Sequence, residues 1–177
     1  MREDLFLGFG GNLGDVKEHF RFAIDAIRDS EHFEIQGISS AYRTDALTVS
    51  GIDSEKPSYW NIVVRASSDL TPTALLKFCK MLEVESGRNQ DAPRWSSRTL
   101  DIDILAWGEL TIDSPELQLP HPHCLERSFV LAPWSELAPG FQLRFNDVVA
   151  RIGDAWKELE SDQSYQPKIL GVDAQWA

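Results

Sequence analysis

Residues 94–104 read Arg-Trp-Ser-Ser-Arg-Thr-Leu-Asp-Ile-Asp-Ile, a polar start that turns into alternating carboxylate and branched apolar side chains. Alternation with a period of two is typical of a β-strand, because successive side chains of a strand point to opposite faces. The pattern therefore predicts that Asp101 and Asp103 project together from one face of a strand. Ile102 and Ile104 then point to the other face, which suits a buried side.

This pair of carboxylates has two interpretations. Two like charges on one face repel each other and raise the pKa of one group, and a divalent cation between them removes that repulsion. Carboxylates for a hard cation, next to a guanidinium such as that of Arg98 for anionic oxygens, are the groups that phosphoryl transfer needs. A half-exposed edge strand, with Asp101 or Asp103 paired to Arg94 or Arg98, explains the same residues. The stretch alone leaves both interpretations open.

The composition narrows the class of protein. At 177 residues the chain fits one domain with a substantial core, so we expect a single domain over 1–177. Six Trp and nine Phe argue against disorder, and the net charge of −11 argues against nucleic acid or an anionic membrane as a partner. A small anionic ligand is still compatible with that charge, because a local group of arginines reverses the field within one cleft. The candidates for such a group are Arg88, Arg94, Arg98 and Arg127.

Cysteine use and the N-terminal residues indicate the compartment. Cys79 and Cys124 are isolated in the sequence, which gives no disulfide framework and favours a reducing environment. The first residues contain no apolar stretch long enough for a signal peptide, and no run approaches the length of a membrane span. We therefore expect a cytoplasmic protein. We also expect it to be a monomer whose partners are small molecules.

Periodicity and capping residues predict the order of the elements. Asp15 with Glu18 and Thr71 with Pro72 are start signals for two helices, and Gly87 is a stop signal. Strands are expected over 5–10, 33–42, 59–67 and 100–107, long loops over 44–58 and 89–97, a hairpin turning at 108–109, and helices near 127–137 and 148–159. This order predicts an α+β, ferredoxin-like βαββαβ sandwich, with helices packed on an antiparallel sheet and a helical extension at the C-terminus.

Two local motifs are weak by themselves. The glycine-rich stretch 8–12 resembles a phosphate loop, but a plain strand-to-helix turn explains it better, and no Walker-type motif is present. His121, His123 and Cys124 are zinc-type ligands, yet their spacing leaves no comfortable closed site and no fourth ligand is evident.

Five blocks taken together resemble the 6-hydroxymethyl-7,8-dihydropterin pyrophosphokinase family of folate biosynthesis. They are Gly-Phe-Gly-Gly-Asn-Leu-Gly-Asp (8–15), Ser-Ala-Tyr-Arg-Thr (40–44), Tyr-Trp-Asn (59–61), Glu-x-x-x-Gly-Arg through Arg-Trp-Ser-Ser-Arg-Thr-Leu-Asp-Ile-Asp-Ile-Leu (83–105), and the block around Pro-His-Pro-His (119–134). The match covers roughly residues 5 to 140, and its last two blocks are the specific ones.

The resemblance implies transfer of pyrophosphate from ATP to the hydroxymethyl group of the reduced pterin. It assigns two Mg²⁺ ions to Asp101 and Asp103, and phosphate contacts to Arg88 and Arg98, and these four form the catalytic set. The other residues that it assigns to ATP are Glu83, Trp95, His121 and Arg127, with Trp95 on a loop that closes over the substrates.

The resemblance also implies a pterin site. Tyr59 and Phe129 match its stacking positions, Asn61 matches the residue that reads the pterin edge, and Thr44 and Leu47 offer backbone groups. Without the blocks, Tyr59 and Phe129 are more simply explained as ordinary core aromatics.

Departures from the family pattern keep two alternatives open. Asn89, Gln90 and Asp91 stand where the family usually carries basic residues, and Asp45 replaces a common proline. A diverged paralogue that binds a pterin or nucleotide with weak or altered transfer is one alternative. A non-catalytic ferredoxin-like interaction domain with a salt-bridged strand is the other.

Overall fold

The structure is a computed structural model and describes residues 3–48, 51–53, 55–89, 91–93, 96–145, 148–162 and 168–175. The strands of its central sheet are β1 (Leu5–Gly11), β2 (Phe33–Ile38), β3 (Ala41–Thr44), β6 (Tyr59–Ser68), β7 (Asp101–Trp107) and β12 (Ile169–Asp173). They run in the order β12-β3-β6-β1-β7, with β2 also paired to β6, and every pairing is antiparallel. The strands β6 and β1 therefore lie side by side inside the sheet, and β7 pairs with β1 at one edge.

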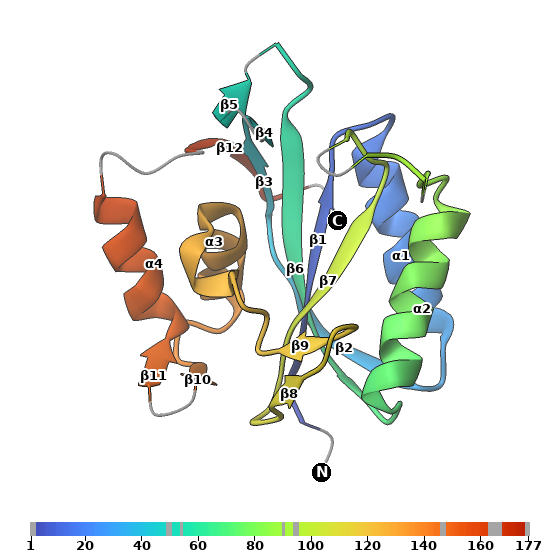
Figure 1. Cartoon of the computed structure of the whole chain (residues 1–177), viewed down its shortest axis with the longest axis vertical. Helices are drawn as coiled ribbons and strands as arrows, with labels where there is room; N and C mark the ends of the chain where they lie inside the picture. Colours follow the sequence, from blue (N-terminus) through green and yellow to red (C-terminus); the bar gives the residue numbers. More distant parts are fainter. Residues whose placement is uncertain are drawn as a thin grey trace.

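Two pairs of helices cover the two faces of this sheet (Figure 1). On one face lie α1 (Val16–Asp29) and α2 (Pro72–Glu85), and on the other α3 (Ser128–Leu137) and α4 (Ile152–Ser161). The smaller elements are β4 (Ala46–Thr48) with β5 (Gly51–Asp53), β8 (Ile112–Asp113) with β9 (Gln118–Leu119), β10 (Gln142–Phe145) with β11 (Val148–Arg151), and the 3₁₀ turn η1 (Cys124–Glu126). The predicted ferredoxin-like α+β sandwich with a C-terminal helical addition is confirmed.

The alternation of β1 creates one core on each face of the sheet. Leu7 and Phe9 are buried in the cluster under α1 and α2. Phe6 points the other way and contacts Trp134 of α3, with ring centroids 5.1 Å apart. Because one strand contributes to both cores, the two helical layers are held by a shared sheet.

Local start and stop signals act as the sequence predicts. The Glu18 N–H donates to Asp15 Oδ1 at 3.2 Å, and the Ala74 N–H donates to Thr71 Oγ1 at 3.3 Å. Gly87 follows α2 with a φ of +87°, the left-handed conformation that glycine adopts without strain. Among the described residues, no helix is long and apolar enough to cross a membrane.

The prediction of one strand over 33–42 is wrong, because the chain breaks into β2 and β3 around Ser39. Between the pairs Ile38–Val64 and Tyr42–Asn61 the chain advances four residues (38 to 42) while β6 advances three (64 to 61). One extra residue must be accommodated, as in a β-bulge. The Ser39 hydroxyl accepts from the Val63 N–H at 2.9 Å and so replaces a missing backbone acceptor.

Three other predicted segments differ from the structure. The described part of the predicted loop 44–58 contains the hairpin β4–β5. The segment after Gly108 pairs within β8–β9 rather than returning along β7, and the chain meets β7 again where the His121 N–H donates to the Leu105 carbonyl oxygen. The last helix begins at Ile152 instead of 148, since 148–151 pairs with β10 as β11.

Candidate active site

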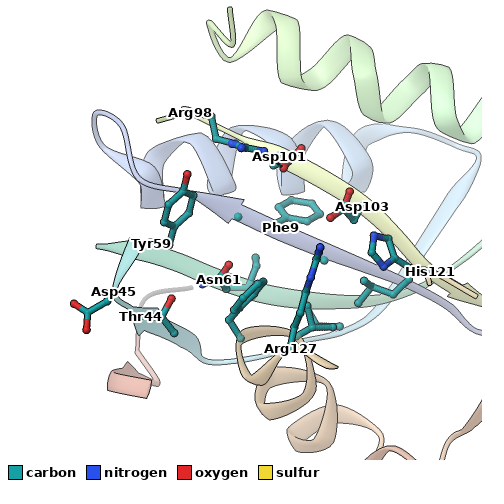
Figure 2. Close-up of a pocket in the computed structure, with 17 residues that line it drawn as sticks. Phe9, Thr44, Asp45, Tyr59, Asn61, Arg98, Asp101, Asp103, His121 and Arg127 are labelled. Carbon is teal, nitrogen blue, oxygen red and sulfur yellow. Dashed lines mark hydrogen bonds and ion pairs between the residues drawn. The ribbon is translucent and has the colours of Figure 1, made fainter. Parts of the chain in front are cut away.

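A cavity of about 290 Å³ opens on the α3 face of the sheet, near the N-terminus of α3. Strands β1, β6 and β7 form its floor. The residues that line it are far apart in the sequence, from Gly8 to Val130 (Figure 2). The glycines of β1 leave room for a ligand above the strand: Gly10 lies between Asn61 of β6 and Asp101 of β7, and Gly8 lies between Val63 and Asp103.

The two aspartates share this cavity, as the alternation predicts. Asp101 and Asp103 both line it, while Ile102 and Ile104 are buried in the opposite core. Asp101 forms ion pairs with Arg88 and Arg98. Burial pushes the pKa of Asp101 up, but the Arg98 and Arg88 guanidinium groups outweigh it and hold that pKa below its usual range.

Asp103 has a different environment from Asp101. Burial, and then the negative charge of Asp101, raise the pKa of Asp103 to about 6. A buried carboxylate with a raised pKa next to a second, ionised carboxylate is an arrangement that a cation relieves.

His121 and Arg127 also line the cavity. The His121 N–H donates to the carbonyl oxygen of Leu105 at 2.8 Å, which fixes this residue beside β7. Burial, and then the charge of Arg127, lower the pKa of His121 to about 4, so its ring is neutral at physiological pH. Figure 2 shows the Arg127 side chain extending toward Asp103 and His121.

The rest of the cavity is aromatic and amide-lined. Tyr59, Asn61, Phe129 and Thr44 all line it. The Nδ2 group of Asn61 is buried without a hydrogen-bond partner among the described residues. Such an orphaned donor is costly unless a ligand accepts from it.

Two predicted ATP contacts are behind the cavity wall. Glu83 is 2% exposed, and its carboxylate accepts from the Ile102 N–H at 2.8 Å and pairs with Arg88 at 2.6 Å. The cavity lining includes Arg98 but neither Glu83 nor Arg88. Glu83 therefore holds the start of β7 and the side chain of Arg88 from behind Asp101.

Two predicted positions have side chains outside the part of the chain that the structure describes. Trp95 lies outside the described residues, as does the side chain of Leu47, whose backbone belongs to β4. Asp45 lines the outer end of the cavity next to Thr44 (Figure 2).

Sequence reasoning missed Asn12, which joins the loop after β1 to the loop before β7. Its Oδ1 accepts from the Arg98 N–H at 2.9 Å, and its own N–H donates to the Arg98 carbonyl at 2.9 Å. The neighbouring Gly11 has its Cα so close to Thr99 that a Cβ would lie 2.5 Å from the Thr99 carbonyl oxygen. The Gly-Gly-Asn stretch was the available signal, and it acts by positioning Arg98 rather than by cradling a phosphate itself.

Comparison with known proteins identifies the family. The family model "7,8-dihydro-6-hydroxymethylpterin-pyrophosphokinase" matches residues 6–139. The 2-amino-4-hydroxy-6-hydroxymethyldihydropteridine pyrophosphokinase of Pseudomonas aeruginosa is 35% identical over 81% of this chain and 85% of that protein. The protein of the same name from Bacillus subtilis is 32% identical over 77% of this chain and 79% of that protein.

A solved structure supports the fold. An HPPK-DHPS crystal structure in complex with substrates superposes with a TM-score of 0.67 at 13% identity, covering 90% of this chain. The chain spans 44% of that longer protein. The family model and the sequence relatives show that the chain belongs to the 7,8-dihydro-6-hydroxymethylpterin-pyrophosphokinase family and is a diphosphokinase.

Proposed function

We propose that the cavity on the α3 face binds ATP and 6-hydroxymethyl-7,8-dihydropterin side by side and transfers pyrophosphate between them. One observation carries this assignment: a single cavity contains a carboxylate pair and arginines at one end, and an aromatic and amide pocket at the other. The first end suits a triphosphate with its counter-ions, and the second suits a flat, polar-edged ring.

The carboxylate end fits magnesium. Asp101 and Asp103 project from one face of β7, and the raised pKa of Asp103 reflects its burial and then the charge of Asp101, a repulsion that a cation would relieve. Among the described residues no group of three or more His, Cys, Asp or Glu side chains is arranged as a closed metal site. Mg²⁺ does not require one, because it keeps water and takes phosphate oxygens. When bound, two such ions would offset the negative charge that develops on the phosphate oxygens.

The basic residues would position the triphosphate. Arg98 and Arg127 line the cavity from opposite sides, and a guanidinium group can donate two parallel hydrogen bonds to one phosphate. Neutral His121 offers a ring N–H without adding charge. Arg88, held by Glu83, supports Asp101 from behind and keeps its carboxylate ionised.

The aromatic end would hold the pterin. Phe129 and Tyr59 provide faces on which the ring can stack, and the unpaired Nδ2 of Asn61 can donate to a ring acceptor. Thr44 and Asp45 bound the far edge of this pocket. We also propose that residues 1–177 act as one domain, since both helical layers pack on one sheet, and that this domain acts as a monomer.

Release of AMP tests the assignment. The protein should release AMP when it is mixed with ATP, magnesium and the hydroxymethyldihydropterin. Asp101→Asn should lower turnover by roughly 100-fold or more, since electrostatic positioning supplies most of the acceleration. Asp25→Asn is the matched control, because Asp25 is an exposed carboxylate on α1. Equal turnover in Asp101→Asn and Asp25→Asn would overturn the site.

The same AMP-release assay distinguishes an active pyrophosphokinase from the diverged-paralogue alternative. Asp45 at the edge of the pocket is the observation that favours it, because it adds a carboxylate beside the proposed ring site. Calorimetric binding of the pterin with an ATP analogue, together with no AMP from ATP, would support this alternative. Rapid AMP release with the usual pterin would remove it.

A further inference from the structure

The C-terminal strand β12 adds an outer strand to the sheet beside the proposed pterin pocket. It lies beyond residue 139, where the match to the family model ends. It pairs antiparallel with β3, so that Ile169 lies opposite Thr44, Gly171 opposite Arg43 and Asp173 opposite Ala41. Figure 1 shows β12 along β3 at the outer edge of the sheet. The strand that carries Thr44 is therefore held on both of its edges, by β6 and by β12.

Side chains on the α1 face join β12 to the rest of the molecule. Asp173 forms an ion pair with Lys17 in the first turn of α1. The Lys17 ammonium lies 4.5 Å from the centroid of the Trp60 ring, and the Arg43 guanidinium lies 6.0 Å from the same centroid. Arg43 crosses Gly171, where a Cβ would lie 3.9 Å from two guanidinium nitrogens. We call Lys17, Arg43, Trp60 and Asp173 the C-terminal clasp.

The C-terminal clasp lies directly behind the pterin pocket. Trp60 is flanked in β6 by Tyr59 and Asn61, which line the cavity on the opposite face of the sheet. Arg43 likewise precedes Thr44, which also lines the cavity. Because neighbouring residues of a strand are one backbone step apart, fixing Trp60 and Arg43 from behind limits the movement of the three pocket residues.

The position of Lys17 is unfavourable for the helix alone. A positive charge in the first turn opposes the helix dipole, which favours anionic groups there. The Lys17 ammonium also lowers the pKa of Asp173, as expected for a carboxylate that gains a cationic partner. Lys17 is therefore better explained by its partners in β12 and β6 than by its own helix.

We propose that Lys17 and Asp173 are positioning residues for pterin binding, and that the C-terminal segment acts in the reaction by bracing the wall formed by Tyr59, Asn61 and Thr44. This inference rests on the proposed pterin site. Among the described residues, the ion pair, ring contacts and strand pairing of the clasp involve α1, β3, β6 and β12, whereas the phosphate end of the cavity lies on β7 and the loop before it. Of the three braced residues, Tyr59 reaches that loop, through its hydroxyl to the Ser96 carbonyl oxygen at 3.5 Å, so the brace should affect the pterin more than ATP.

Kinetics of full-length variants test the brace. Asp173→Asn and Lys17→Met should each raise the KM for the pterin by about 3–10-fold while changing the KM for ATP less than twofold, since a partly exposed ion pair and a cation–π contact are each modest. The double variant should raise the KM for the pterin no further than Lys17→Met does, because the two side chains act as a unit. Arg28→Met, which breaks an exposed ion pair with Asp25 on the same helix, should leave both KM values unchanged.

Hydrogen exchange supplies a readout that needs no turnover. Backbone amides of residues 41–44 and 59–61 should exchange faster in Asp173→Asn than in wild type or Arg28→Met. An unchanged pterin KM, an equal rise in the KM for ATP, or identical exchange in these segments would overturn the proposal. If wild type released no AMP, the proposed function would fail, and exchange would still decide whether the clasp braces this wall.

Discussion

Asp101 and Asp103 point from the same face of one strand, yet their surroundings give them opposite protonation behaviour. Asp101 faces two guanidinium groups that lower its pKa, whereas burial and the charge of Asp101 raise the pKa of Asp103 to about 6. The sequence predicted the shared face from the period of two. It could not predict which carboxylate pairs with the arginines, because Arg88 is held next to Asp101 by Glu83, a buried residue of α2.

The raised pKa of Asp103 predicts a stability cost in the empty protein. Protonated Asp103 stabilises the fold; this contribution is fully present below the unfolded-state pKa near 4 and is lost as the pH rises through about 6. At pH 7.5 Asp103→Asn should therefore raise the free energy of unfolding by roughly 1–3 kcal/mol, while abolishing most turnover. Urea unfolding at pH 7.5 and pH 4.5 measures this. A variant less stable than wild type at pH 7.5 would contradict the prediction.

His121 predicts the opposite slope with pH. Its pKa falls from an ordinary 6.5 to about 4 in the folded protein, so the unfolded chain binds the proton more readily between these values. Stability should decrease as the pH is lowered from 6.5 to 4. His121→Gln should make this dependence shallower, as measured by urea unfolding at pH 7 and pH 5. Parallel curves for variant and wild type would show that His121 does not contribute.

At the scale of elements, the sequence predicted what local signals control. Asp15, Thr71 and Gly87 set the ends of α1 and α2 through contacts within one turn, so they could be read directly. The break at Ser39 depends on the register with β6, and the pairing of β12 depends on β3, more than 120 residues away in the chain. Long-range pairings of this kind carry no local signal.

The junction between β1 and β7 predicts a strict requirement at Gly11. A Cβ there would lie 2.5 Å from the Thr99 carbonyl oxygen, a backbone atom that cannot rotate away. Gly11→Ala should displace the segment that carries Arg98, lower kcat at least 10-fold and cost about 1–3 kcal/mol of stability. Gly140→Ala is the control, because its nearest neighbour would be 3.9 Å away. Turnover and thermal unfolding of the two variants should differ clearly.

At the scale of the whole molecule, the site is assembled from segments that are far apart in sequence. The cavity draws Asn61 from β6, Asp103 from β7 and Phe129 from α3 onto one face of the shared sheet. The sequence blocks predicted these members because a family resemblance carries residue roles, whereas periodicity alone made Phe129 a core residue. Asn12 was missed because its contacts with Arg98 cross 86 positions of the chain.

The charged side chains of the cavity predict how ligands stabilise the molecule. An ATP analogue with magnesium should raise the melting temperature. A ligand whose concentration is 100 times its dissociation constant adds about 2.7 kcal/mol to the free energy of unfolding. Either component alone should have a smaller effect, because Asp101 and Asp103 would repel the phosphates without the cation. Removing magnesium with a chelator should reverse the shift in a thermal melt. An equal shift with the analogue alone would contradict the two-aspartate metal site.

The ion pairs of Asp101 with Arg88 and Arg98 have a consequence for product release. In the empty protein this carboxylate pairs with Arg98, the guanidinium that the proposed function gives to a phosphate, while Arg88 holds it from behind. A phosphate bound to Arg98 would therefore share that guanidinium with Asp101. When the phosphate leaves, Asp101 would already be in contact with Arg98, so the empty site would form again without movement of the strand.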